Sequence, residues 1–287
     1  LVREKVSIDP ADGQDKIINA MLNTISRVLG RSPSTSKGLI GIGAGVPGLV
    51  EMEHGVLVFA PNFRWRNVPL KDILQRQFNV PVYVDNEANA GALGEKWFGA
   101  GQGVQDMVYL SVGVGLGAGI VINGELYRGA TGYAGEVGHF TIMPDGPLCG
   151  CGNRGCWETL ASEGAALRRA ADALERGESS ILRELVHRSQ GEIPAPGNDR
   201  PAGGQPGRQQ GGESGGDGMH RGLSLDLLVE ACEQGDRVAR QALEETGRFL
   251  GVGMAGVINS YNPEIVIVGN TIGRCGKWVL ERGAEEV

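Results

Sequence analysis

Apolar residues recur at helical spacing along much of the chain. In residues 12–30 they occupy every third or fourth position, and Gly30 follows the last of them. This spacing, closed by a glycine, predicts an amphipathic helix. The same pattern predicts further helices over residues 68–78, from just after Asn86 to 101, and over 158–177, 224–235 and 236–262.

Short runs rich in β-branched residues lie between these helices. They predict a buried strand and turn over 38–50, a strand over 80–86, two strands with a hairpin over 106–129, and a buried strand over 263–270. The Asn123-Gly124 pair suits the type I′ turn of a hairpin. Because strands alternate with helices, the pattern predicts an α/β protein. We expect a smaller α/β domain over residues 1–104 and a larger one over 105–287.

Residues 191–222 interrupt this alternation. They contain 11 glycines and 4 prolines among 32 positions, and almost no apolar residue. Such a composition cannot bury enough apolar surface to offset the entropy of ordering the segment. We therefore expect a disordered surface insertion, and a partner-binding tail is the less favoured interpretation.

Composition and charge narrow the class of protein. The chain has 287 residues, of which 41% are hydrophobic, enough for one large or two ordinary globular domains. Neither an apolar run of membrane-spanning length nor a secretory signal is visible, so a cytoplasmic protein is expected. The net charge of −7 argues against a nucleic-acid surface within these residues. The start at Leu1 rather than Met leaves room for a basic domain upstream.

Three of the five cysteines fall within eight positions, at Cys149, Cys151 and Cys156. In a cytoplasmic protein such a cluster indicates metal binding more than disulfides. Zinc favours four thiolate or imidazole ligands in a tetrahedron, and His139 is the nearest histidine. We therefore predict a structural Cys3His zinc site. Reduced structural thiols or a strained local disulfide are the alternatives.

Acidic residues accompany this cluster and a second, amide-containing motif. Glu136 and Glu158 flank the predicted zinc ligands, so zinc would hold both carboxylates where they can bind a polyol; otherwise they are solvated surface acids. Asn86 and Glu87 lie where a strand meets a helix, a common place for ligands in α/β proteins. Helix capping is the alternative there.

A glycine-rich segment, residues 111–119, raises the question of nucleotide binding. Its Gly113-Val114-Gly115 sequence is followed by a predicted strand and not by a helix, so it fails the context test for a dinucleotide fingerprint. The glycines either let a phosphate approach the backbone or permit close packing.

Taken together, these segments resemble the ROK family of sugar kinases and sugar-responsive repressors. The matching stretches are residues 41–50, 60–65, 84–95, 129–140, 149–162 and 250–269. They cover most of residues 38–270 apart from the insertion, and the cysteine signature with Glu136 and His139 is highly specific. The resemblance implies an actin-like ATPase fold of the ribonuclease H-like, hexokinase type, with a sugar in the cleft between two domains.

The resemblance also implies roles for individual residues. The zinc ligands would be His139, Cys149, Cys151 and Cys156. The monosaccharide contacts would be Gly48, Asn62, Asn86, Glu87, Glu136, His139 and Glu158. His139 would serve both groups, with one ring nitrogen on zinc and the other toward a sugar hydroxyl. Members of the family often form homodimers or homotetramers.

Departures from the family's kinases favour a regulator. Those kinases carry Asp as the general base where this chain has Glu87, and Gly-Thr-Gly where it has Gly113-Val114-Gly115. Their Gly-Gly-Gly loop corresponds to Gly269-Asn270-Thr271. Their first strands and first phosphate loop, Asp-x-Gly-Gly-Thr, would lie before Leu1. The sugar half of the site is kept while the ATP half differs, and the Asn86-Glu87 pair resembles that of the family's xylose-repressor branch.

We therefore expect the sugar-sensing domain of a transcriptional regulator, with a structural Zn²⁺ and without a membrane partner. DNA would be bound by a winged helix-turn-helix N-terminal to this chain. The alternative is an ATP-dependent hexose kinase that uses ATP-Mg, with Glu87 as the general base. A third interpretation is a carbohydrate-binding protein with neither activity.

Overall fold

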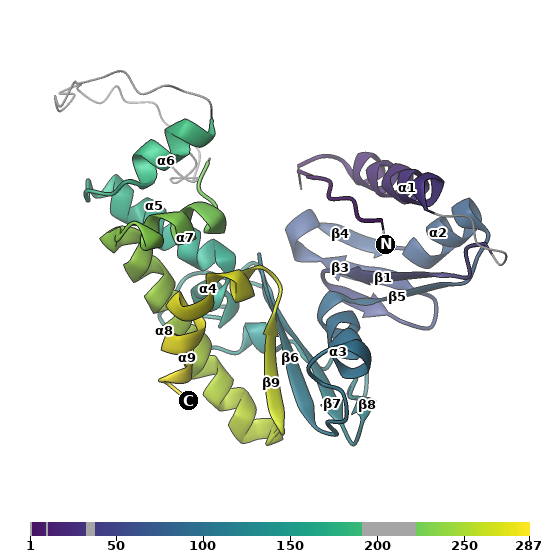
Figure 1. The fold of residues 1–287 in the computed structure, drawn as a ribbon. Coiled ribbons are helices and arrows are strands. Elements are labelled where there is room, and N and C mark those ends of the chain that lie inside the picture. The colour runs from purple at the N-terminus through teal and green to yellow at the C-terminus, as the bar shows by residue number, and fades with distance from the viewer. Residues whose placement is uncertain (1, 10, 33–37, 191–221) are drawn as a thin grey trace.

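The computed structural model describes residues 2–9, 11–32, 38–190 and 222–287, and Figure 1 shows the arrangement of their helices and strands. The helices are α1 (Gln14–Arg31), α2 (Leu70–Phe78), α3 (Glu87–Phe98), α4 (Glu158–Ala161), α5 (Glu163–Glu175), α6 (Leu182–Ser189), α7 (Leu225–Glu233), α8 (Arg237–Tyr261) and α9 (Leu280–Ala284). The strands are β1 (Ile42–Val46), β2 (Leu49–Glu51), β3 (Val56–Ala60), β4 (Trp65–Val68), β5 (Val82–Asn86), β6 (Met107–Val112), β7 (Leu116–Ile122), β8 (Glu125–Leu126) and β9 (Ile265–Gly269). This confirms the predicted α/β class.

The predicted elements are found with several corrections. The helix expected over 158–177 is two helices, because Ser162 is extended and its hydroxyl accepts a hydrogen bond from the backbone of Ala165 as the N-cap of α5. Residues 106–129 form three strands rather than two, with the predicted turn at Asn123-Gly124 between β7 and β8. The insertion predicted at 191–222 lies outside the described residues, apart from Gly222.

Two strands predicted to be buried are less covered than expected. β1 alternates half-buried and exposed residues, and every residue of β9 is half-buried. In the described part of the chain, β1 pairs with β5 alone and β9 is an edge strand that pairs with β6. Edge strands have one neighbour, so their apolar residues stay partly open to solvent.

The N-terminal part contains two small sheets with α1 and α2 against them (Figure 1). β1 and β5 form a parallel pair, and β2, β3 and β4 form an antiparallel sheet that the sequence patterns did not predict. One apolar cluster joins these elements, with Ile18 of α1, Leu57 of β3, Leu74 of α2 and Val84 of β5 among its buried members. The C-terminal end of β5 is thereby fixed relative to β2 and α1.

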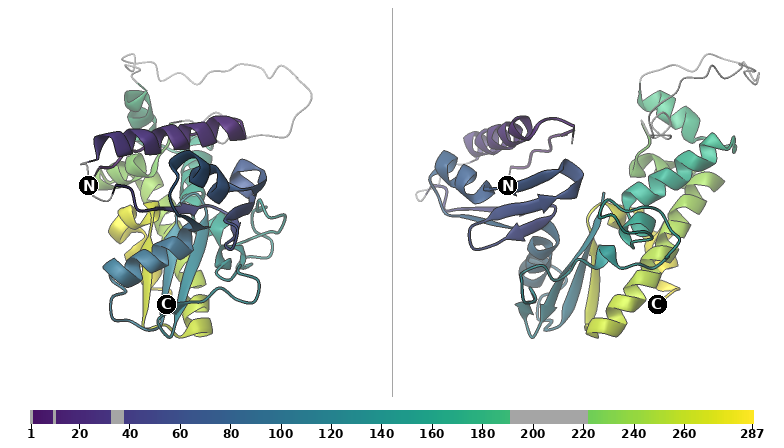
Figure 2. Two further views of the ribbon diagram at one scale, coloured as in Figure 1. Left: turned by 90° about the vertical axis from the view of Figure 1, so that its right-hand side faces the viewer. Right: turned by 180° about the vertical axis from the view of Figure 1, so that it is seen from behind.

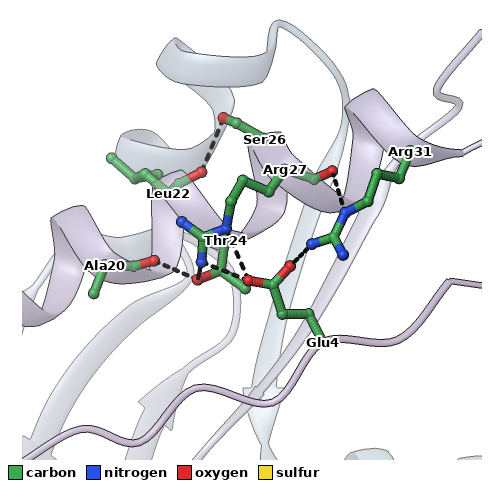
Figure 3. Close-up of polar contacts among 7 residues, drawn as sticks. All are labelled: Glu4, Ala20, Leu22, Thr24, Ser26, Arg27 and Arg31. Atoms are coloured by element: carbon green, nitrogen blue, oxygen red, sulfur yellow. Dashed lines mark hydrogen bonds and ion pairs between the residues drawn. The ribbon is translucent and has the colours of Figure 1, made fainter.

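The segment before α1 is attached to that helix through Glu4, as Figure 3 shows. The Arg27 side chain donates a hydrogen bond from Nε to Glu4 Oε1 at 2.8 Å, and Arg31 also donates to this carboxylate. The hydrogen bond from Arg27 and the two positive charges lower the pKa of Glu4. Both arginine side chains are exposed, so these ion pairs hold the segment before α1 against the helix but add little to the stability of the fold.

The C-terminal part is built on one sheet of order β8-β7-β6-β9, with β6 antiparallel to β7 and parallel to β9. Figures 1 and 2 show α3 on one side of this sheet and α4–α9 on the other. Residues of β6 alternate accordingly. Val108, Leu110 and Val112 join the large helical core, whereas Met107 and Tyr109 belong to the smaller cluster with Ala92 of α3. None of the helices in the described ranges has the length and apolarity needed to cross a bilayer.

Small residues allow α3 to approach the sheet closely. A Cβ atom on Gly119 of β7 would lie 2.4 Å from both the Ala88 carbonyl oxygen and the Ala92 Cβ. On the helix side, a Cβ on Gly91 would lie 2.4 Å from the Tyr109 ring. Glycine at these positions sets how near the first turn of α3 comes to β6 and β7.

This close packing predicts a stability effect. Gly119→Ala should lower the free energy of unfolding by about 1–3 kcal/mol, because the added methyl group must push α3 away from the sheet. The control is Gly94→Ala on α3, where an added Cβ meets no atom within 4 Å. That change should stabilise the protein by about 0.5–1 kcal/mol, since alanine favours a helix. Urea unfolding measures both, and equal effects of the two substitutions would contradict the packing argument.

Candidate functional site

Asn86 caps the helix that begins at the end of β5. Its Oδ1 accepts hydrogen bonds from the backbone N–H of Ala88 at 2.8 Å and of Asn89 at 3.4 Å, so the capping interpretation is correct. Its Nδ2 donates to the Gly48 carbonyl oxygen at 3.0 Å. Asn86 therefore joins the start of α3 to the turn between β1 and β2. Gly48 has φ of 108°, and a Cβ there would lie 2.3 Å from the Phe59 carbonyl oxygen.

Glu87 is the first residue of α3, where a negative charge is favoured by the helix dipole. The hydroxyl of Ser111 on β6 donates to Glu87 Oε1 at 3.4 Å. The residue as a whole is exposed, but desolvation by nearby protein raises the pKa of Glu87. The hydrogen bond from Ser111 favours the charged form and partly offsets that rise.

Asp85 and Arg128 form an ion pair that the sequence analysis did not find. Arg128 Nη1 donates to Asp85 Oδ1 at 3.2 Å, and Nη2 donates to Oδ2 at 2.7 Å. The pair joins the end of β5 to the loop after β8, 43 residues away in the chain. Asn89 also donates to Asp85 Oδ1, at 3.2 Å, but its own Oδ1 is buried without a hydrogen-bond partner among the described atoms. In the sequence, its place next to Asn86 could have marked Asp85 as a site residue, but nothing there points to Arg128 as its partner.

A small pocket lies beside these groups. Three of the predicted sugar contacts, Gly48, Asn86 and Glu136, line it together with Asn89 and the loop 132–136. Its volume is about 10 Å³, which is space for about one water molecule. Asn62, exposed in the turn between β3 and β4, is not among the described residues that line the pocket. A monosaccharide would need the pocket to open.

The predicted metal ligands lie together. The ligand atoms of His139, Cys149, Cys151 and Cys156 are all within 4.8 Å of one another. His139 Nδ1 is 3.6 Å from Cys149 Sγ, and Cys151 Sγ is 3.7 Å from Cys156 Sγ. The cysteines are free, which contradicts the disulfide alternative because bonded sulfurs are about 2.05 Å apart. The cluster could hold a metal ion.

Local backbone contacts bring the cysteines to this point. The N–H of Cys149 donates to the Asn153 carbonyl at 2.8 Å, and that of Gly155 donates to the Pro147 carbonyl at 2.8 Å. Gly155 has φ of 62°, and a Cβ there would lie 1.5 Å from the Met143 carbonyl oxygen. Glycine is therefore required for the loop to fold back on itself. Without a metal, burial raises the pKa of the Cys149 and Cys156 thiols.

The two carboxylates near the cluster contact opposite sides of the imidazole. Glu158 Oε1 lies 3.7 Å from His139 Nδ1 and accepts a hydrogen bond from Cys149 Sγ at 3.0 Å. Glu136 Oε2 lies 3.8 Å from His139 Nε2. Neither carboxylate is a freely solvated surface acid. Burial raises the pKa of Glu136, and the nearby His139 opposes that rise.

The glycine-rich turns of β6 and β9 lie side by side, and side chains join them. Asn270 Nδ2 donates to Ser111 Oγ at 3.1 Å, and a Cβ on Gly113 would lie 2.9 Å from the same amide nitrogen. Thr271 donates to Glu163 Oε2 at 2.6 Å, and the Glu163 N–H donates to the Gly113 carbonyl at 2.8 Å. Sequence reasoning noted residues 269–271 but not these contacts.

Comparison with known proteins places this geometry in context. A sequence model of the ROK family matches residues 2–286. The xylose repressor of Caldicellulosiruptor bescii is 40% identical over 295 residues, and the alignment covers 100% of this chain but 64% of the repressor. This chain therefore spans less than two thirds of that relative's length.

Two solved structures are also similar to the chain. A ROK family glucokinase from Streptomyces griseus, in complex with glucose and AMPPNP, superposes with a TM-score of 0.78 at 32% identity, covering 97% of this chain and 79% of that one. A ROK family transcriptional regulator, a homologue of the E. coli MLC protein, superposes with a TM-score of 0.70 at 29% identity. That alignment covers 95% of this chain and 60% of the regulator.

The Asp85–Arg128 pair gives a prediction for the junction at the site. Its side chains are 16% and 27% exposed, so Arg128→Gln should cost roughly 1–3 kcal/mol of unfolding free energy by leaving a half-buried carboxylate with fewer donors. The matched control is Arg240→Gln, which removes an exposed pair with Glu244 and should change stability by less than about 0.5 kcal/mol. Urea unfolding compares the two variants. A cost for Arg128→Gln no larger than that of the control would contradict the structural role of the pair.

Proposed function

The chain belongs to the ROK family and has that family's actin-like ATPase fold, and on this premise we propose that it is the sugar-sensing part of a transcriptional regulator. The observation that carries the proposal is the position of His139. Its Nδ1 faces the cysteine cluster and its Nε2 faces Glu136, so the predicted metal site and the predicted sugar site share one side chain. The similarity to a xylose repressor supports a regulator over other sugar-binding proteins.

Zinc is the metal we propose for the cluster. Bonds of about 2.3 Å to sulfur and about 2.0 Å to nitrogen at tetrahedral angles place two sulfurs about 3.8 Å apart and a sulfur about 3.5 Å from a nitrogen. The separations of 3.7 Å between Cys151 and Cys156 and 3.6 Å between His139 and Cys149 agree with these values, and the other pairs of ligand atoms lie within 4.8 Å. Three thiolates and an imidazole would fill all four positions, so the ion would be structural.

For the sugar we propose the contacts implied by the resemblance. Glu136 and Glu158 each lie beside a ring nitrogen of His139, and Glu136, Asn86 and Gly48 line the adjacent pocket. Carboxylates and an imidazole bound to zinc through Nδ1 offer the acceptors and the donor that sugar hydroxyls need. Glu87 and Asn62 would join as the pocket opens and recloses around the ligand.

Sensing requires two states with different affinity for the sugar. The two main apolar clusters share no residue, one drawing on residues 18–84 and the other on residues 108–279. This separation supports two domains with a boundary between residues 84 and 108, the span that contains the expected one near residue 104. Because Ala92 of α3 packs with Met107 and Val121 of the C-terminal sheet, the two domains would close about the chain before α3. A winged helix-turn-helix upstream of this chain would then respond to closure, because sugar and DNA binding are linked reciprocally.

A sugar kinase is the second candidate, favoured by the similarity to the Streptomyces griseus glucokinase. Glu87 would be its general base, and the raised pKa of this carboxyl group suits a group that takes up a proton. Against a kinase, Val114 at the tip of the β6–β7 turn offers no hydroxyl to a phosphate and is 73% exposed.

The zinc proposal predicts the metal content of purified protein. Mass spectrometry of digested protein should find about one zinc per chain, because four protein ligands complete the tetrahedron. Cys156→Ser should abolish the zinc and lower the melting temperature by at least about 5 °C, since loss of the ion also releases the loop. The control is Cys232→Ala, which removes a buried thiol remote from the cluster and should leave the zinc in place. Stoichiometric zinc in Cys156→Ser would rule out this ligand set.

The functional proposal predicts sugar binding without nucleotide turnover. In titration calorimetry, D-xylose or D-glucose should bind, ATP-Mg should not, and a coupled assay should detect no ADP release with either sugar. Glu87→Gln should weaken sugar binding roughly tenfold, because a charged acceptor is lost. Because the pKa of Glu87 is raised, this carboxylate takes up a proton at a higher pH than an ordinary glutamate does. As the pH is lowered, the wild-type affinity should therefore begin to fall at that higher pH, and Glu87→Gln should lose this part of the pH dependence. Sugar-dependent ADP release would establish the kinase instead.

A further inference from the structure

Asn270 has a backbone conformation that asparagine seldom adopts. It follows β9 directly, with φ of 67° and ψ of −154°. This region of backbone space is almost restricted to glycine, and other residues persist in it where the surrounding structure demands it. Asn270 is exposed, so burial of its side chain does not account for the conformation. The contact that does involve its side chain is the hydrogen bond from Nδ2 to Ser111 Oγ, at 3.1 Å.

Ser111 lies between two glycines on the neighbouring strands. It is buried on β6 and shares a face with Tyr109, the face covered by α3. Its neighbours across the strands are Gly117 on β7 and Gly269 on β9, so neither cross-strand partner carries a side chain. Its hydroxyl can therefore turn, and its direction depends on its hydrogen-bond partners.

The two hydrogen-bond partners of Ser111 determine which atom its hydroxyl proton points toward. The amide nitrogen of Asn270 is a donor, so Ser111 Oγ must accept from it. The single hydroxyl proton of Ser111 then remains for Glu87 Oε1, 3.4 Å away. Donation runs from Asn270 through Ser111 to the carboxylate, and this order favours the charged, accepting form of the carboxylate.

We propose that Asn270 is a positioning residue for sugar binding, which through Ser111 orients the Glu87 carboxylate toward the ligand. The inference rests on the proposed sugar-sensing function and adds to it a residue from the loop after β9, 159 positions from Ser111 in the chain. It also gives the unusual backbone of Asn270 a purpose, because this conformation brings the amide to the serine.

The test compares substitutions that change the order of donation with one that does not. Asn270→Asp keeps the size of the side chain but replaces the donor with a second carboxylate, so that the new carboxylate and that of Glu87 compete for the one proton of Ser111. Asn270→Gly removes the side chain and suits the backbone. In calorimetry with D-xylose and D-glucose, each should raise the Kd of the sugar that the wild-type protein binds by roughly tenfold. Ser111→Ala should do the same, and the double variant Asn270→Gly/Ser111→Ala should bind no more weakly than either single variant.

The matched control is Thr271→Val, which removes the neighbouring bond to Glu163 and leaves the path to Glu87 intact. It should change the Kd by less than about twofold. Melting temperatures show whether a variant is folded, and Asn270→Gly should melt no lower than the wild type, because glycine relieves the positive φ.

The outcomes separate the two ideas. A wild-type Kd in Asn270→Asp would overturn the inference alone, since a side chain that merely filled space would tolerate this change. Equal weakening in Thr271→Val would do the same, because the effect would then belong to the loop as a whole. If the wild-type protein bound neither sugar, the proposed function would fail and the inference with it.

Discussion

The imidazole of His139 faces a thiol with one nitrogen and a carboxylate with the other, and the rest of the site depends on this double contact. A metal ion on Nδ1 would leave the proton on Nε2, so that the face toward Glu136 becomes a fixed donor. Glu136 and any sugar hydroxyl beside it must then act as acceptors. With the proposed metal bound, the fold of the cysteine loop, which needs glycine at position 155, would decide hydrogen-bond polarity in the neighbouring pocket.

The strand β6 supplies the second constraint, because its alternation assigns each residue to one side of the sheet. Leu110 and Val112 are held in the helical core, which leaves Ser111 between them on the side of α3. The close approach of α3, allowed by Gly119, then brings Glu87 to this serine. A packing requirement between α3 and the sheet therefore places a carboxylate at the candidate site.

Sequence patterns predicted the features that depend on neighbouring residues. The start of α3 after Asn86, the Asn123-Gly124 turn and the His139–cysteine cluster all follow from local spacing, and all are present. The division of residues 158–177 at Ser162 and the small sheet of β2, β3 and β4 were missed, because the apolar spacing continues through the break and the strands are short. The Asp85–Arg128 and Ser111–Asn270 contacts span 43 and 159 positions, and a single sequence carries no signal that pairs such distant residues.

The groups that join β6 and β9 bear on the choice between sensor and kinase. Phosphoryl transfer needs donors and cations around the phosphates. At the turn after β9, Thr271 donates its hydroxyl proton to Glu163, so the Glu163 carboxylate places negative charge beside Thr271. A triphosphate at this turn would approach a like charge, which costs binding energy. The sugar-side groups carry no such conflict. In the proposed sensor, the same fold would lack the energetic basis for catalysis and keep that for recognition, and the free energy of sugar binding would shift the protein between two conformations.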